Sequence, residues 1–392
     1  MNHKQGPSTR SVHLGTKIDA ATGALIPPII QNAAYCYEDI DRWRAAALKQ
    51  VPGHIYSRNS NPTAEAFERR MAALEGTEQA ISFATGMAAI SATLFGLLDA
   101  NKRAVTVRDA YGATYLHFTQ ILPRFDVDCV VCDTEDSEGV DAAIEKGCDL
   151  LYLETPTNPI LKVLDLEKLI PIAHKKGALV VVDNTFATPI NQSPLALGAD
   201  VVIHSATKYL CGHGDVLGGV VCGRKAILDK IYRYRELTGA SLDAHCAFLL
   251  LRSLKTLGLR VQRQNENAMA VSRFLDKQHQ IERVFYPGLE THPDHDIAKK
   301  QMSGFGGVLS FELKGGYEAI KLFLPRLEFA YMAANLGQVE TIVGPPSTTS
   351  HVELTAEERK EAGVPEGLIR YAVGIEDKED LLADLEAALR TL

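Results

Sequence analysis

Several features that mark particular protein classes are missing from this sequence of 392 residues. No run of apolar residues approaches the roughly 18 that suggest a membrane-spanning helix. The polar stretch at residues 1–7 lacks the apolar core of a secretory signal peptide. We therefore expect a cytoplasmic protein that has no membrane partner.

The sequence also lacks an excess of positive charge. Lysine and arginine total 41 against 49 aspartate and glutamate residues, which gives a formal net charge of −8. A nucleic-acid-binding protein needs a basic stripe that neutralises phosphates. The acidic balance and the hydrophobic content of 46% instead indicate a soluble globular protein without a nucleic-acid partner.

Cysteines and histidines form neither a disulfide framework nor a metal site. The seven cysteines are odd in number and scattered along the chain. Cys129 and Cys132 form a Cys-x-x-Cys pair, but they lie in an apolar strand-like run, where these two positions face opposite sides. This favours a buried strand over a redox or metal site. No cysteine or carboxylate cluster accompanies His292 and His295, so no metal is predicted.

Two common phosphate-binding motifs are absent as well. The sequence contains neither Gly-x4-Gly-Lys-Ser/Thr nor Gly-x-Gly-x-x-Gly after an apolar strand. ATPases and nicotinamide-dependent enzymes are therefore disfavoured.

A chain of 392 residues is too long to fold around a single hydrophobic core of ordinary size, so two domains are expected. Residues 1–60 are punctuated by prolines and look helical only near 39–49. We interpret them as an extended arm that reaches a neighbouring subunit, and the alternative is a poorly ordered terminus. From residue 61 onward, apolar runs alternate with helical stretches, among them 61–76, 86–98 and 166–175. The runs lack polar alternation, which is typical of a mostly parallel sheet covered on both faces. They lie at residues 104–107, 127–132, 150–153, 179–182, 201–203 and 220–222.

The C-terminal third differs in character. A long helix-like region is predicted over about residues 242–278, and strands with one polar face are predicted at 308–313 and 369–373. Residues 377–392 form an amphipathic pattern with leucines on one side. The predicted α/β protein thus has an arm, a large domain and a smaller α+β domain, divided at 1–60, 61–254 and 255–392.

The strongest chemical signal is Lys208, which follows an apolar strand and two hydroxyl residues, Ser205 and Thr207. Another apolar strand ends in Asp183. A lysine that can form a Schiff base, hydroxyls that can hold a phosphate and a carboxylate that can pair with a pyridinium nitrogen are what pyridoxal phosphate requires. A strand-end lysine or aspartate alone is a weak signal, but together these residues point to pyridoxal phosphate.

Other candidates lie where such a site needs them. Gly86 and Met87 open an apolar helix, where backbone N–H groups and the helix dipole favour a phosphate. Tyr111 follows a strand and can stack on the cofactor ring or act as an acid. Arg370 interrupts an apolar strand, which suits capture of a substrate carboxylate, although a structural salt bridge is the competing interpretation.

Together with further segments, these residues make the sequence resemble the Cys/Met-metabolism pyridoxal-phosphate enzymes. This family includes cystathionine γ-synthases and γ-lyases, methionine γ-lyases and homoserine-ester sulfhydrylases. The likeness spans about residues 10 to 390. It rests on the segments Tyr56-Ser57-Arg58, Asn61-Pro62-Thr63, Thr85-Gly86-Met87, Tyr111-Gly112, residues 154–159, Asp183-Asn184-Thr185, residues 205–209 and Leu336-Gly337 ahead of Arg370.

The resemblance implies the fold-type I architecture, with a mostly parallel seven-stranded sheet, and a homotetramer built from two dimers with shared active sites. Tyr56 and Arg58 are then expected to bind the phosphate of a neighbouring subunit's cofactor. The resemblance places the remaining candidates around the cofactor in the same chain. These are the phosphate ligands Gly86, Met87, Ser205 and Thr207, the stacking Tyr111, the ring-oxygen ligand Asn158, and the substrate-binding Asn335 and Arg370.

The implied reaction acts at the γ-carbon of a sulfur-containing amino acid. We favour γ-elimination of the methionine γ-lyase type, which yields 2-oxobutanoate, ammonia and a thiol. The alternative is γ-replacement on an O-acylhomoserine. A regulator without catalysis and an aminotransferase are weaker alternatives, because Lys208, Tyr111 and Asp183 are all present.

Four departures from the family patterns bear on the substrate. Ala113 stands where methionine γ-lyases usually have cysteine, and Ala334 stands where animal cystathionine γ-lyases have glutamate. Asn335-Leu336-Gly337 resembles the sulfhydrylases more than the Ser-Leu-Gly of lyases and synthases. Residues 344–351 fit no subgroup pattern closely.

Overall fold

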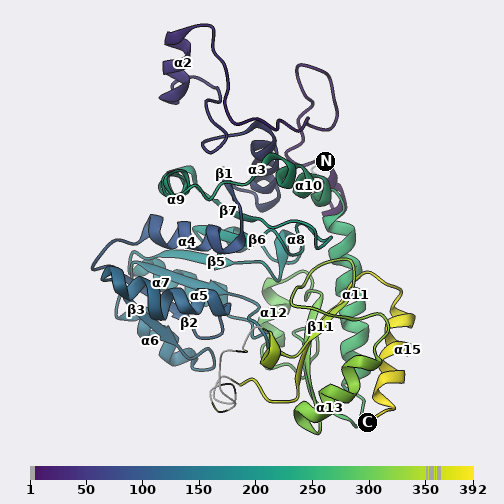
Figure 1. Ribbon diagram of the computed structural model, residues 1–392. Coiled ribbons are helices and arrows are strands. Elements are labelled where there is room, and N and C mark those ends of the chain that lie inside the picture. Colours follow the sequence, from purple (N-terminus) through teal and green to yellow (C-terminus); the bar gives the residue numbers. More distant parts are fainter. Residues whose placement is uncertain (1–4, 350–351, 353–356, 358, 360–362) are drawn as a thin grey trace.

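The computed structural model describes residues 5–349, 352, 357, 359 and 363–392 (Figure 1). Of the unusual segment 344–351, the last two residues lie outside this description. Within the described residues we find no helix with the length and apolar character that crossing a membrane requires.

Helices make up most of the regular structure. They are α1 Pro7–His13, α2 Ile40–Ala47, α3 Pro62–Glu75, α4 Gly86–Leu97, α5 Gly112–Leu116, α6 Ser137–Glu145, α7 Leu166–Lys175, α8 Thr188–Asn191, α9 Lys225–Thr238, α10 Ala244–Leu254, α11 Leu257–Leu275, α12 His295–Gln301, α13 Gly316–Phe323 and α15 Lys378–Leu389. A π-helix, His117–Ile121, extends α5, and short 3-10 turns lie at Leu122–Phe125, Pro194–Leu197, Leu324–Arg326 and Pro346–Thr348.

The larger sheet has seven strands in the order β1-β7-β6-β5-β4-β2-β3. The strands are β1 Gln79–Phe83, β2 Arg103–Val107, β3 Asp128–Cys132, β4 Leu150–Glu154, β5 Leu179–Asp183, β6 Val201–Ser205 and β7 Gly219–Gly223. Neighbouring strands are parallel except around β7, which pairs antiparallel with both β1 and β6. This confirms the predicted mostly parallel sheet.

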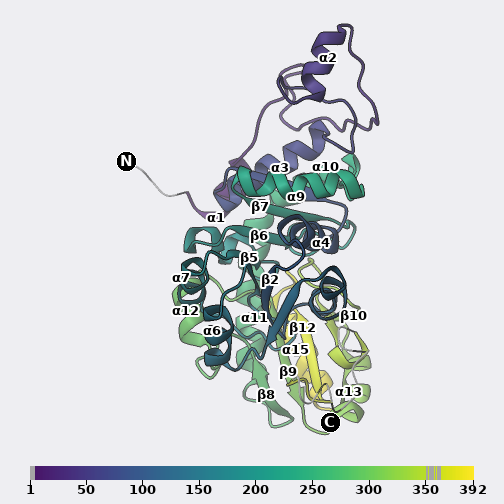
Figure 2. The same ribbon diagram turned by 90° about the vertical axis from the view of Figure 1, so that its left-hand side faces the viewer.

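Helices cover both faces of this sheet, as its apolar strands require. On one face, Val181, Ile203 and Val221 share an apolar cluster with residues of α4 and α9. On the other face, Val180 and Val182 pack with α6 and α7. Figure 2 shows α4 and α7 on opposite sides of the strands. The sheet is therefore rigid, and its strand ends are fixed points for side chains.

The strand assignment of the Cys-x-x-Cys pair is confirmed. Both cysteines lie in β3 as free thiols. Cys129 packs in the cluster under α4, whereas Cys132 packs in the cluster under α6 and α7. The two thiols therefore belong to opposite faces of the sheet.

The helix-like region predicted over residues 242–278 contains two separate helices, α10 and α11, with a break between them that the sequence did not indicate. The buried Arg260 stabilises the break. Its Nη2 donates to Ser253 O at 3.0 Å, and its Nε donates to Thr256 Oγ1 at 3.0 Å. Its Nη1 donates to Tyr209 O at 2.7 Å, which ties the break to the residue after Lys208.

The second sheet has five strands in the order β10-β11-β12-β9-β8. They are β8 Ile281–Phe285, β9 Val308–Leu313, β10 Tyr331–Met332, β11 Ile342–Gly344 and β12 Leu368–Ala372. α13, α15 and the second half of α11 cover one face. The helix predicted from residue 377 is confirmed, with Leu381 and Leu385 fully buried.

The prediction that strands β9 and β12 have one polar face is wrong. Nearly all of their residues are buried. The second face packs against the part of the chain that carries the larger sheet: Val308 and Ala372 join its core, and Ser310 Oγ donates to Pro159 O at 2.6 Å. This contact places β12 beside the strand ends of the larger sheet.

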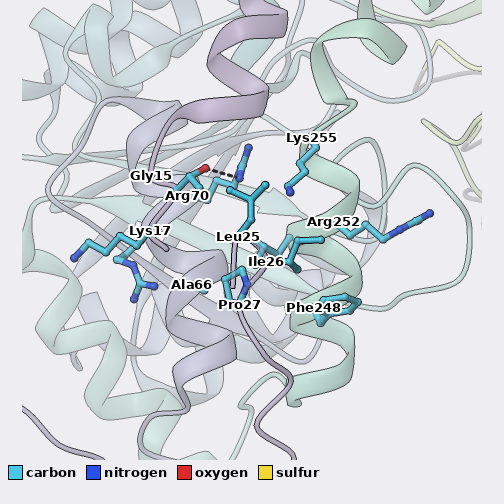
Figure 3. Close-up of a pocket in the computed structure, with 13 residues that line it drawn as sticks. Gly15, Lys17, Leu25, Ile26, Pro27, Ala66, Arg70, Phe248, Arg252 and Lys255 are labelled. Carbon is cyan, nitrogen blue, oxygen red and sulfur yellow. Dashed lines mark hydrogen bonds between the residues drawn. The ribbon is translucent and has the colours of Figure 1, made fainter. Parts of the chain in front are cut away.

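The N-terminal arm projects from the body of the molecule, with α2 at its tip (Figures 1 and 2). Ile40 and Trp43 at this tip are 77% and 50% exposed. The base of the arm is anchored by the buried Arg70 of α3, which donates to Val12 O at 2.6 Å and to Thr16 Oγ1 at 3.0 Å. Figure 3 shows Arg70 in this junction, where the arm, α3 and α10 enclose a cavity of about 230 Å³. The base of the arm is thus held in place, while the apolar side chains at its tip are exposed in a single chain.

Candidate active site

A cavity of about 320 Å³ lies where the strands of the larger sheet end and the second sheet begins. In open α/β sheets, ligands bind outside the carboxyl ends of the strands. The cavity is lined by Thr85, Gly86, Met87, Ile90, Tyr111, Glu154, Asn158, Asp183, Thr185, Phe186, Ser205, Thr207, Lys208, Leu217, Ala334, Leu336, Thr349 and Arg370. The structure therefore brings together in one cavity all the candidates predicted to act in the same chain except Asn335, which contacts Lys208 from its edge.

Lys208 follows β6 by three residues and enters this cavity. Burial, reinforced by the positive charge of Arg370, lowers the pKa of Lys208 to about 8. The Lys208 Nζ donates a hydrogen bond to Asn335 Oδ1 at 2.7 Å. A far larger fraction of this amine is neutral near pH 7 than in an ordinary lysine, as a nucleophile and base requires.

Asp183 and Glu154 are neighbours at the ends of β5 and β4, because the two strands pair in parallel with these residues in register. Asp183 Oδ1 accepts from Thr185 N at 3.0 Å and from Thr185 Oγ1 at 2.5 Å. Burial raises the pKa of the Asp183 carboxyl. A cationic ring nitrogen beside this carboxyl would favour its ionised form, since opposite charges stabilise each other in a site of low dielectric.

Glu154 also lies in the site, although the sequence analysis assigned no role to it. It is 3% exposed, and burial, followed by the charge of Asp183, raises its pKa well above the ordinary value. Its Oε2 accepts from the Tyr111 backbone N–H at 2.7 Å. The signal that could have found it is the same as for Asp183, an apolar strand that ends in a carboxylate.

Tyr111 lies at the start of α5, just beyond β2, and its side chain is 46% exposed. The bond to Glu154 fixes its backbone at the cavity wall. A tyrosine in this place can lay its ring over a planar ligand while its hydroxyl stays accessible.

The start of α4 and the end of β6 form a small polar cradle. A Cβ atom added to Gly86 would lie 2.8 Å from both Cβ and Oγ of Ser205, so only glycine permits this approach. Thr207 Oγ1 accepts from Gly218 N at 3.0 Å, which holds its hydroxyl at the cavity. Backbone N–H groups at the first turn of a twelve-residue helix, together with two hydroxyls, suit a phosphate group.

Arg370 reaches the cavity from β12 of the second sheet. Its Nη1 donates to Asn158 Oδ1 at 3.0 Å, and its Nη2 donates to Asn335 O at 3.2 Å. Burial lowers the pKa of Arg370 to about 10, so the guanidinium stays charged at neutral pH. Among the described residues, no carboxylate forms an ion pair with this buried cation, which leaves it a carboxylate-binding group facing the cavity.

Ala334 lines the cavity beside Leu336 and Leu217, and together they give it an apolar wall. Ala113 is the second residue of α5, and its carbonyl oxygen accepts from His117 Nδ1 at 2.9 Å.

Tyr56 and Arg58 lie apart from this cavity. They line a separate hollow between the arm and the start of α10, and Arg58 Nη1 donates to Glu236 O at 2.8 Å. The structure of a single chain therefore does not bring them to the Lys208 site.

The donor set of the Lys208 cavity fits pyridoxal phosphate. It offers a lysine of lowered pKa, a buried carboxylate, a glycine-dependent cradle and an uncompensated arginine. The sequence also matches the model of the Cys/Met metabolism PLP-dependent enzyme family over residues 8–390. The chain belongs to this family. It is therefore a pyridoxal-phosphate-dependent enzyme with the fold of that family.

Several curated and solved relatives match nearly the full length of the chain. L-methionine gamma-lyase of Fusobacterium nucleatum subsp. polymorphum is 43% identical over 99% of both chains. O-succinylhomoserine sulfhydrylase of Pseudomonas aeruginosa is 43% identical over 93% of this chain and 90% of its own. The crystal structure of cystathionine gamma synthase from Xanthomonas oryzae pv. oryzae, in complex with cystathionine, matches with a TM-score of 0.93 at 36% identity over 99% of both chains.

Proposed function

We propose that this enzyme catalyses γ-elimination on sulfur-containing amino acids, with methionine as the leading substrate. The observation that carries the proposal is the single cavity that combines Lys208, the cationic Arg370 and an apolar wall at Ala334. An apolar wall suits a thioether side chain better than a charged one. The end-to-end similarity to L-methionine gamma-lyase supports the same choice.

Pyridoxal phosphate, when bound, supplies an aldehyde that condenses with amines and a ring that accepts an electron pair from the substrate. We assign its phosphate to Gly86, Met87, Ser205 and Thr207. Asp183 would hold the proton on the ring nitrogen. The side chains of Tyr111 and Asn158 would face the ring and its oxygen.

Three residues of the chain, Arg370, Lys208 and Tyr111, are assigned to substrate binding and proton transfer. Arg370 binds the substrate carboxylate and so aims the Cα–H bond at the Lys208 Nζ. Lys208 would take the proton from Cα and deliver it to the bound cofactor, which restores the neutral amine that then takes a proton from Cβ. Its pKa near the working pH allows it to act in both directions. The Tyr111 hydroxyl donates a proton to the departing sulfur. With methionine and water the products are 2-oxobutanoate, ammonia and methanethiol.

An assay of methionine, homocysteine, cystathionine and O-acetylhomoserine, each with and without sulfide, tests this proposal. We expect 2-oxobutanoate and thiol from methionine without any added thiol. Product that forms only in the presence of sulfide or cysteine would contradict the proposal.

The alternative function is γ-replacement on an O-acylhomoserine. The Asn335-Leu336-Gly337 segment and the similarity to O-succinylhomoserine sulfhydrylase favour it. In the same assay, this function predicts a new thioether or thiol amino acid from O-acetylhomoserine and sulfide, and little release of 2-oxobutanoate.

We further propose that the enzyme is a homotetramer of two dimers and that Tyr56 and Arg58 complete the site of the neighbouring subunit. The projecting arm with its exposed Ile40 and Trp43 supports this assembly, because apolar groups of this size are usually covered. The proposed division into an arm (1–60), a large domain (61–254) and a C-terminal domain (255–392) is supported by the break between α10 and α11.

Mixing two inactive variants tests the shared site. Arg58→Ala and Lys208→Ala, each inactive or weak alone, should regain about a quarter of wild-type activity when co-assembled, because half of randomly formed dimers are hybrids with one intact site of two. Activity is measured after co-expression, with separately purified variants as controls. Activity no greater than the sum of the separate variants would show that the two residues act in the same chain.

A further inference from the structure

Three side chains link Lys208 to the protein surface. Lys208 Nζ donates to Asn335 Oδ1 at 2.7 Å. Asn335 Nδ2 donates to Gln338 Oε1 at 2.9 Å, and Gln338 Nε2 donates to Glu340 Oε2 at 3.1 Å. Asn335 and Gln338 are partly buried, whereas Glu340 is exposed. We call these three residues the amide relay.

The carboxylate of Glu340, the outermost residue, determines which group donates and which accepts in each hydrogen bond of the relay. An ionised carboxylate only accepts hydrogen bonds, so Gln338 must turn its NH2 group to Glu340. The Gln338 oxygen then faces Asn335 and takes its NH2 group. This leaves the Asn335 oxygen, and not its nitrogen, facing Lys208. An exposed charge thereby decides which end of a partly buried amide meets the reacting amine.

The backbone holds this relay in place. Gln264 Nε2 donates to Gln338 O at 2.9 Å. A Cβ atom added to Gly337, which has φ +75°, would lie 2.8 Å from the ring and the backbone nitrogen of Tyr209. A Cβ atom added to Gly214 would lie 2.8 Å from Gln338 Oε1. The relay is therefore packed against the residue that follows Lys208, and its amides have little freedom except to exchange oxygen and nitrogen.

We propose that Gln338 and Glu340 are positioning residues that fix the Asn335 amide so that Lys208 always meets a hydrogen-bond acceptor. This inference rests on the role of Lys208 in the proposed function. The acceptor binds one N–H of the neutral amine, which directs the lone pair away from Asn335 and into the cavity. It also stabilises the ammonium that Lys208 becomes once it holds a proton.

Other groups around Lys208 belong to other elements and stay unchanged in relay variants. Arg370 of β12 lowers the pKa of Lys208, together with burial. Asp183 and Glu154 lie at the ends of β5 and β4, and Tyr111 lines the same cavity from the start of α5. A change in the pKa of Lys208 on altering the relay therefore reports on the Asn335 amide.

The first test compares Glu340→Gln and Glu340→Lys with the matched controls Glu290→Gln and Glu290→Lys at another exposed carboxylate. The pKa of Lys208 is measured in the protein without cofactor, by competitive acetylation across a pH series and mass spectrometry of the Lys208 peptide. Glu340→Lys places a donor at the end of the relay, which favours the reversed amides. We expect it to lower the pKa by about one unit, a tenfold change, and Glu340→Gln to lower it by less. In the holoenzyme, kcat should fall in the same order while KM stays constant.

The second test separates orientation from charge. In the double variant Gln338→Glu/Glu340→Gln the net charge is unchanged, and the carboxylate moves one position inward. It still only accepts, so the Asn335 oxygen must still face Lys208. We expect a pKa at or above the wild-type value and the wild-type kcat.

Two results would overturn the proposal. One is a Lys208 pKa in both Glu340 variants equal to that in the Glu290 controls. The other is a double variant that behaves like Glu340→Gln. Because the pKa is measured without cofactor or substrate, a failed methionine assay alongside the expected pKa changes would reject only the proposed function.

Discussion

Replacing Lys208 with alanine should lower kcat by at least about 10⁴-fold, the largest effect expected of any single substitution. Lys208 is the only lysine among the described residues that line the cavity, and we assign to its Nζ both the covalent attachment of the cofactor and the two proton transfers. Its loss therefore removes more than one catalytic contribution. The measurement is the rate of 2-oxobutanoate release from methionine with cofactor in excess.

Lys255→Ala is the matched control, because Lys255 is also partly buried but lines the cavity at the base of the arm. It should keep the wild-type rate. Substantial turnover by Lys208→Ala would remove Lys208 from the chemistry.

Replacing Asp183 with asparagine should lower kcat by roughly 10²- to 10³-fold, comparable to the loss of one preorganised electrostatic contact at a reacting group. Asparagine keeps the shape of the side chain and can still accept the hydrogen bonds from Thr185. It lacks the negative charge that would hold the proton on the cofactor ring, so the ring accepts electrons less well. Cofactor absorbance should persist while the steady-state rate falls.

Glu154→Gln is the matched comparison at the neighbouring strand end. Burial raises the pKa of Glu154, so its carboxyl is easier to protonate than an ordinary glutamate, and this substitution removes less charge than the loss of an ordinary carboxylate would. Its amide oxygen can still accept from Tyr111 N. We expect a much smaller loss than for Asp183→Asn, and equal losses would argue against a special role for the Asp183 charge.

Much of the fold was predictable, because the relevant signals are local. The helix Leu166–Lys175 has the predicted bounds, with Asp165 as its N-cap. Asn61 and Gly76 cap α3 as expected. The strands were visible as apolar runs that end in polar residues. β1 was missed, because its five residues directly follow a helix and begin with a polar glutamine.

The errors arose where contacts distant in sequence decide the structure. Neither of the two residues between α10 and α11, Lys255 and Thr256, is a proline or a glycine, and the break is stabilised by Arg260 and its bond to Tyr209 O. The buried second face of β9 and β12 depends on another part of the chain, through contacts such as that of Ser310 with Pro159. The pattern of apolar and polar residues within a short segment does not indicate either of these contacts.

The predictions for the site also succeeded where the signal is local and failed where it depends on distant contacts. Lys208 and Asp183 could be placed together because carboxyl ends of neighbouring parallel strands meet at one edge of a sheet. The contact between Lys208 and Asn335 spans 127 positions and requires the second sheet to dock. The amide relay was therefore invisible in the sequence, although its residues are close neighbours along the chain.

The most direct test of the central claim is reduction of the purified holoenzyme with borohydride, followed by peptide mapping. We predict loss of the visible absorbance and a stable phosphopyridoxyl group on the peptide that contains Lys208. A colourless protein, or a label on any other lysine, would contradict the account.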